Sequence, residues 1–140
     1  MATFTKFQQF VEDIAVGAHN LNTDTLGIAL TTQAFIPVVT NEILGNLTQI
    51  AYTNLSARTI TPTSAVHTTG TLKLLLPDLL LTASGAVATF RHVVLYNVTQ
   101  TTAPVNPLIG WYDYGSDVTL ADTETFNIDF DQAAGVLTIV

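Results

Sequence analysis

Val87-Ala-Thr-Phe-Arg-His-Val-Val-Leu-Tyr-Asn-Val98 is a long β-prone run near the middle of the chain, and it decides the fold class. From Arg91 onward, both the odd-numbered and the even-numbered side chains are largely apolar. Successive side chains of a strand point to opposite faces, so a run that is apolar on both faces indicates a central strand covered on both sides.

Shorter β-prone segments, separated by turn residues, lie on both sides of this run. They are Thr25–Thr31, Thr48–Thr53, Ala57–Thr61, Thr71–Leu76, Leu79–Thr82, Leu108–Tyr114, Val118–Leu120, Thr125–Phe130 and Val136–Val140. One of the turns between them is expected at Gly115-Ser116. Many short strands at intervals of roughly 8–12 residues are typical of sandwiches and barrels. The sequence therefore predicts one mainly β domain over residues 1–140, an antiparallel β-sandwich or barrel of jelly-roll-like form.

The N-terminal segment is the exception, because its apolar residues recur at steps of three and four. The members of this apolar stripe are Phe4, Phe7, Phe10, Val11 and Ile14. Such spacing places them on one face of a helix, so we predict one helix within residues 4–16, with Thr3 at its start and Gly17 just beyond its end. A short helical turn is also expected within Thr40–Leu47. The stripe is expected to pack on the domain's own sheet, with docking onto a partner as the alternative.

The composition is poor in charge and rich in apolar residues. Charged residues make up 11% of the chain, against about 25% in a typical domain, while hydrophobic residues make up 48%. Either partners cover much of the surface, or neutral Thr side chains coat it. The net charge is −7 and no Lys or Arg follows Arg91. Nucleic-acid and membrane-surface binding both need clustered basic residues, so neither is expected.

Targeting and membrane segments are not predicted. The sequence from Met1 to Phe4 has no cluster of positive charge followed by an apolar region, as a signal peptide would. No run approaches the ~18 apolar residues of a membrane span.

Catalytic and metal-binding patterns are also missing from the sequence. The absence of Cys excludes disulfides, thiolate metal sites and a Cys nucleophile. His19, His67 and His92 lack metal-ligand spacing. Carboxylates are concentrated toward the C-terminus, at Asp113, Asp117, Asp122, Glu124, Asp129 and Asp131. We expect this acidic stretch to form a solvated face, with a Ca²⁺ site as the alternative. The sequence predicts no enzyme, no cofactor and no metal.

Aromatic residues gather in the segment Pro107–Gly115, which holds the only Trp of the chain. Trp111 is expected in the core, while the positions of Tyr112 and Tyr114 stay open. Together with Phe4 and Phe7 of the N-terminal stripe, these two tyrosines are candidate interface residues.

Several segments resemble small virion proteins of tailed bacteriophages. They are Phe4-Thr-Lys-Phe7, His19-Asn-Leu21 with Thr25-Leu26, Arg91-His-Val-Val-Leu-Tyr-Asn97, and Pro107 to Asp122. The resemblance covers most of the chain but carries no catalytic signature. The stretch from Ala51 to Thr69 lacks the Gly-rich turns expected of such proteins.

The resemblance implies a capsid decoration (cement) protein, made in the host cytoplasm and located in the virion. Its implied partners are further copies of itself, in a homo-oligomer such as a trimer, and the major capsid protein or another virion protein. A tail or fibre component, acting as a binding module for a host glycan, is the alternative. A flat apolar surface would favour the first function, and an exposed groove of aromatic and carboxylate side chains would favour the second.

Overall fold

The computed structural model describes residues 2–140, and it is mainly β, as predicted. Its strands are β1 Phe4–Lys6, β2 Leu26–Thr31, β3 Thr59–Ile60, β4 Ser64–Thr68, β5 Thr71–Leu75, β6 Leu79–Thr82, β7 Val87–Asn97, β8 Leu108–Leu120, β9 Thr125–Ile128 and β10 Leu137–Ile139. The helices are α1 Phe10–Ala15 and the single 3₁₀ turn η1 Leu44–Asn46. Neither of these helices is long and apolar enough to cross a bilayer.

The largest sheet has five strands in the order β1-β8-β7-β2-β3, and every neighbouring pair is antiparallel. β7 lies at its centre, and Val93, Val94 and Leu95 are all buried there. The prediction of a central strand covered on both faces is confirmed.

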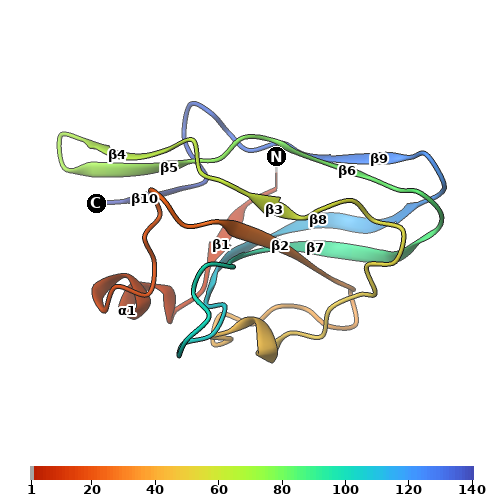
Figure 1. The fold of residues 1–140 in the computed structure, drawn as a ribbon, viewed down its shortest axis with the longest axis horizontal. Helices are drawn as coiled ribbons and strands as arrows, with labels where there is room; N and C mark the ends of the chain where they lie inside the picture. The colour runs from red at the N-terminus through yellow and green to blue at the C-terminus, as the bar shows by residue number, and fades with distance from the viewer. Residues whose placement is uncertain (1) are drawn as a thin grey trace.

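The other strands form two smaller antiparallel sheets, β10-β5-β4 and β6-β9. β6 follows β5 after the break at Pro77-Asp78. Figure 1 shows these strands on one side of the five-stranded sheet, with α1 and the segment between β2 and β3 toward the other side. The finer prediction, a jelly-roll-like sandwich or barrel, stays a prediction.

Buried apolar side chains form two clusters. The larger one, here called the inner core, draws members from all three sheets, including Ile28, Leu74, Leu81, Phe90 and Ile128. The smaller one, here called the outer core, contains Phe7, Ala29, Val94, Leu108 and Trp111. Because neighbouring residues such as Val93 and Val94 belong to different clusters, the two cores lie on opposite faces of the five-stranded sheet.

The helix predicted over residues 4–16 is correct only in its second half. Phe4–Lys6 is instead strand β1, which pairs with β8 at the edge of the large sheet. Gln9, not Thr3, occupies the N-cap position of α1. Pairing with β8 gives hydrogen-bond partners to the backbone groups of Phe4–Lys6, which the first turn of a helix would leave unpaired. This pairing outweighs the helical spacing of the apolar residues in the sequence. Gly17 does follow the helix with a φ of +80°, as predicted.

Three strand predictions are wrong in the middle and late parts of the chain. Thr48–Thr53 is not a strand, and Ala57–Thr61 reduces to β3. The expected turn at Gly115-Ser116 does not interrupt β8, because the residues on both sides of it pair with β7, Asp113 with His92 and Val118 with Phe90, across a register shift typical of a β-bulge. The helical turn expected within Thr40–Leu47 is present as η1.

β4 was not predicted, although its hairpin to β5 has a local signal. Thr69 and Gly70, which connect the two strands, have φ values of +50° and +85°. Positive φ at both central residues is the geometry of the tight turn that joins two antiparallel strands. Gly70 was therefore the mark of this hairpin in the sequence.

Candidate functional site

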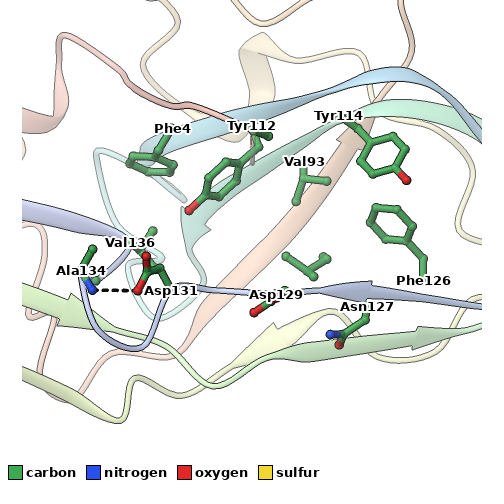
Figure 2. Close-up of a pocket in the computed structure, with 13 residues that line it drawn as sticks. Phe4, Val93, Tyr112, Tyr114, Phe126, Asn127, Asp129, Asp131, Ala134 and Val136 are labelled. Atoms are coloured by element: carbon green, nitrogen blue, oxygen red, sulfur yellow. Dashed lines mark hydrogen bonds between the residues drawn. The ribbon is translucent and has the colours of Figure 1, made fainter.

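A groove of about 350 Å³ opens between β8 and the chain that runs from β9 to β10. Figure 2 shows its aromatic side chains in two groups with Val93 between them, while Asn127 points away from the rings on the other side of its strand. We call it the aromatic groove. The residues that line it include Phe4, Val93, Tyr112, Tyr114, Phe126, Asn127, Asp129 and Asp131.

Strand geometry explains why the aromatic rings meet. Tyr112 and Tyr114 are two residues apart on β8 and so point to the same face. β1 pairs with β8 so that Phe4 lies opposite Tyr112, with ring centroids 5.0 Å apart. Phe126 of β9 meets Tyr114 edge to face at 5.2 Å. Tyr114 remains 53% exposed, so one ring of the groove is open to a ligand.

Gly110 makes the approach of β1 to β8 possible. A Cβ atom at this position would contact the Phe4 ring and lie 2.7 Å from the backbone oxygen of Thr5. A glycine inside a strand often marks such a close approach. The position of Phe4 in the groove therefore depends on the absence of a side chain at residue 110.

The two carboxylates of the groove differ in their surroundings. Asp131 Oδ1 accepts hydrogen bonds from the backbone N–H of Ala133 at 2.8 Å and of Ala134 at 2.7 Å. These hydrogen bonds, aided by the charge of Lys73, hold the pKa of Asp131 below its ordinary value. Asp129 is exposed and alternates with the inward-facing Phe126 and Ile128, so its carboxylate lies on the solvent side of the chain.

Tyr112 contributes a hydroxyl group to the same wall. Burial, together with the negative charge of Asp131, raises its pKa to about 12. The hydroxyl therefore stays protonated at neutral pH and both donates and accepts hydrogen bonds. Figure 2 shows it pointing toward the side of the groove where Asp131 lies.

Of the four candidate interface residues, the structure brings three together. Phe4, Tyr112 and Tyr114 all line the aromatic groove. Phe7 does not, because it is fully buried in the outer core with its ring 4.6 Å from that of Trp111. The prediction of Phe7 as a surface contact is therefore wrong, while the prediction of Trp111 in the core is confirmed.

Sequence reasoning missed that Phe126 and Asp131 line the same groove as the two tyrosines. It placed Asp129 and Asp131 on a solvated face and Phe126 on the opposite face of the same strand, which the burial pattern of β9 supports. The missing information was that the edge of β9 borders an opening toward β8. No pattern of neighbouring residues in the sequence indicates that β8 and β9 leave an opening between them.

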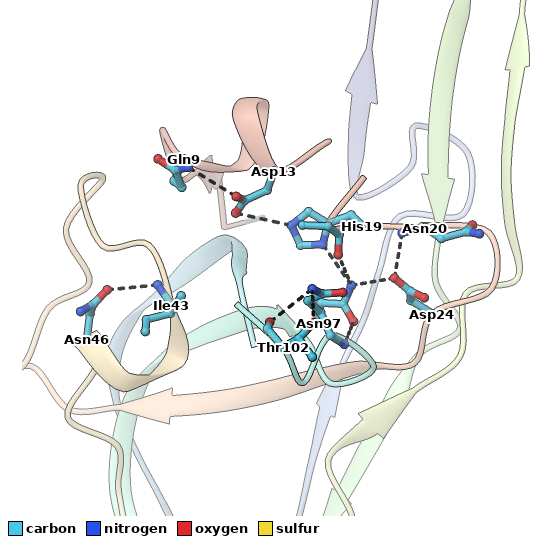
Figure 3. Close-up of polar contacts among 11 residues, drawn as sticks. Gln9, Asp13, His19, Asn20, Asp24, Ile43, Asn46, Asn97 and Thr102 are labelled. Carbon is cyan, nitrogen blue, oxygen red and sulfur yellow. Dashed lines mark hydrogen bonds and ion pairs between the residues drawn. The ribbon is translucent and has the colours of Figure 1, made fainter. Parts of the chain in front are cut away.

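A second polar site, centred on Asn97, lies at the end of β7 (Figure 3). The buried Asn97 Nδ2 donates to Asp24 Oδ2 at 2.7 Å and lies 3.2 Å from His19 Nδ1. Its Oδ1 accepts from the backbone N–H of Thr99 at 2.9 Å and of Gln100 at 3.2 Å. These contacts tie the loop after α1 to the end of the central strand.

His19 carries its proton on the ring nitrogen that faces Asp13. An amide NH₂ group only donates, so His19 Nδ1 must accept from Asn97 and the proton of the neutral ring lies on Nε2. Nε2 is 4.0 Å from Asp13 Oδ2, and neither atom has a hydrogen-bond partner within residues 2–140. Burial lowers the pKa of His19 to about 4 and raises the pKa of Asp13. Both side chains are thereby driven toward their neutral forms, and the site has a structural role.

The acidic stretch contains one clear ion pair. Arg91 Nε donates to Asp113 Oδ1 at 2.7 Å, and Gly115 N–H donates to the same oxygen at 2.8 Å. These hydrogen bonds lower the pKa of Asp113 to about 2. Within residues 2–140, no three His, Asp or Glu side chains gather as metal ligands would.

A third feature is an exposed apolar segment between β2 and η1. Phe35, Ile36 and Val38 are each more than half exposed, and Val39 is about one-third exposed. We call these four residues the loop patch. The backbone oxygen of Val39 accepts from the N–H of Gln8, which fixes the segment beside the start of α1. The loop patch is therefore a fixed surface, held by its neighbours.

Searches against protein-family models, curated protein sequences and solved structures find no match to this chain. The functional argument therefore depends on its own residues.

Proposed function

We propose that the chain is a structural subunit of a phage particle, a decoration protein that associates with copies of itself and with a capsid shell. The observation that carries the proposal is the loop patch. Four apolar side chains within five consecutive residues lie at the surface of a chain in which only 11% of residues are charged.

Burial of the loop patch at an interface supplies a driving force for assembly. Each Å² of apolar surface removed from water contributes roughly 25 cal/mol, before the costs of association are subtracted. Identical subunits commonly close such contacts by rotational symmetry. The resemblance to small virion proteins favours a trimer.

The test compares the oligomeric mass of the wild-type chain with that of a loop-patch variant. Light scattering after size-exclusion chromatography should give the wild-type chain a mass above 15.0 kDa. Phe35→Ser combined with Ile36→Ser should shift the protein to the monomer and remove binding to shells of the major capsid protein.

Leu80→Ser is the matched control, because Leu80 is equally exposed but lies on β6, outside the loop patch. This variant should keep the wild-type mass. A wild-type chain that is monomeric at high concentration and does not bind capsid shells would refute the assembly proposal.

A tail or fibre component is the second candidate function, and the aromatic groove favours it. A chain in that role would use the groove to contact a ligand outside the particle.

A further inference from the structure

We propose that the aromatic groove binds a neutral carbohydrate of about two sugar rings. This inference is independent of the assembly proposal, because the groove lies between β8 and the β9–β10 connection, whereas the loop patch lies between β2 and η1. The two surfaces can be tested separately.

The size and lining of the groove fit such a ligand. Its volume of about 350 Å³ is at the lower end of the roughly 300–1,000 Å³ that is usual for small-molecule sites. Tyr112 and Tyr114 lie on one wall, and Phe126 lies against Tyr114. A sugar ring has an apolar face of C–H groups that packs on aromatic rings and an edge of hydroxyl groups that needs polar partners.

The polar side chains of the groove match that edge. The Tyr112 hydroxyl both accepts and donates hydrogen bonds, and the carboxylate of Asp131 near it accepts them. Within residues 2–140, Asp131 accepts the backbone N–H groups of Ala133 and Ala134 with Oδ1 alone, so its Oδ2 is open to a ligand. Hydroxyl groups of a ligand would satisfy these polar groups while the rings cover its apolar face.

The charge balance selects a neutral ligand over a charged one. No Lys or Arg lines the groove, so an anionic sugar or a phosphate would meet only the carboxylates Asp129 and Asp131. A cation would be attracted by these two groups and by the ring faces. However, Asp131 is already engaged by two backbone N–H groups, and the positive charge of Lys73 lies close enough to lower its pKa. A carboxylate that is compensated in this way suits the hydroxyl groups of a sugar better than an ammonium group.

The experiment is a titration of ¹⁵N-labelled full-length chain with neutral disaccharides, followed by NMR. The probes are maltose, cellobiose, lactose and N,N′-diacetylchitobiose, with choline and sialyllactose as the cationic and anionic comparisons. We expect at least one neutral disaccharide to shift the resonances of β8 and of residues 126–136, with a dissociation constant in the millimolar range.

Two variants locate the site. Tyr114→Ala and Tyr112→Phe should each weaken binding about tenfold, because the first removes a ring on which the ligand packs and the second removes a hydroxyl group that hydrogen-bonds to it. The matched controls are Val66→Ala, an exposed apolar side chain on β4, and Tyr96→Phe, which removes a hydroxyl group on the other face of the sheet. Both controls should bind as the wild-type chain does.

Three results would overturn the inference. They are the absence of shifts with all four neutral disaccharides, tighter binding of choline or sialyllactose than of any of these, and equal weakening by the Val66→Ala control. Because the loop patch is intact in Tyr114→Ala, the mass measurement on that variant shows whether assembly persists when carbohydrate binding is lost.

Discussion

The two faces of the five-stranded sheet are covered by different kinds of structure. On the inner face, regular strands of the two smaller sheets supply most of the covering side chains. On the outer face, the cover comes from Phe7 and from Leu44 and Leu47 in and beside a single 3₁₀ turn. The inner core is accordingly the larger of the two.

The two candidate surfaces, the aromatic groove and the loop patch, are associated with different faces of the five-stranded sheet. The aromatic groove opens at the margin of the inner face, between β8 and the β9–β10 connection, and its aromatic rings are held on strands. The loop patch belongs to the irregular segment that covers the outer face. Rigid elements hold a ligand-binding geometry better than loops do. Association through the loop patch would instead be driven by the apolar surface area that it buries against a partner.

The largest expected effect comes from removing one ring from each core. Phe90→Ala in the inner core should lower the free energy of unfolding by about 4–5 kcal/mol, whereas Phe7→Ala in the outer core should lower it by about 3 kcal/mol. Both side chains are fully buried, but the irregular cover of the outer face can relax into the cavity more easily. Urea unfolding followed by circular dichroism measures both values. Equal losses would show that the two covers are equally rigid.

The next effect concerns pH and the buried His19. Its pKa is about 4 in the folded chain, against 6.5 for the free side chain, so the unfolded chain takes up a proton first as the pH falls. The contribution of His19 to stability should therefore drop by about 3 kcal/mol between pH 7 and pH 4. The raised pKa of Asp13 acts in the opposite direction, because the folded chain then takes up a proton at Asp13 more readily than the unfolded chain does.

Thermal unfolding between pH 7 and pH 4 measures this dependence. His19→Gln should flatten it, because the side chain that titrates is removed, whereas the exposed His67→Gln should leave the slope as it is. An unchanged slope in His19→Gln would assign the acid sensitivity to other groups.

A smaller effect is expected at the close approach of β1 and β8. Gly110→Ala should lower the free energy of unfolding by about 1–3 kcal/mol, because the new methyl group meets the Phe4 ring and the backbone of β1. Gly45→Ala is the control, since the nearest atom to its added Cβ is 3.7 Å away. Gly110→Ala should also weaken disaccharide binding, because the Phe4 ring that it displaces lines the groove. A Gly110→Ala chain as stable as wild type would show that β1 moves freely at the sheet edge.

The smallest effect is expected in the loop patch. Phe35→Ala should change the free energy of unfolding of the monomer by no more than about 0.5 kcal/mol, because the ring is 51% exposed. Chemical unfolding at low protein concentration measures the monomer alone. A loss of several kcal/mol would mean that the loop patch belongs to the outer core.

Where local pattern and burial agree, the sequence was sufficient to predict the elements. The alternation in Thr125–Phe130 and the two-sided apolar run of β7 both correspond to strands with the expected burial. Gly17 likewise marks the end of α1, because its positive φ favours glycine. In each case the determining interaction is local, or depends only on which face of a strand is apolar.

Elements that depend on a distant partner were mispredicted. Phe4–Lys6 has the periodicity of a helix, yet it forms a strand because β8 offers an unpaired edge more than 100 residues later. Thr48–Thr53 is β-prone but finds no partner strand, since a strand needs a neighbour to satisfy its backbone groups. The burial of Phe7 also depends on a distant residue, because its ring packs on Trp111 of β8.

By itself, the sequence determined a mainly β fold, the central strand, the second half of the predicted N-terminal helix and the absence of cysteine chemistry. These follow from composition and from the period of the apolar pattern. Only the tertiary structure decided that Phe4, Tyr112 and Tyr114 line one groove with Phe126 and Asp131. The reason is physical: side-chain period specifies the face on which a residue lies, but the spacing between facing strands is set by the packing of the whole chain.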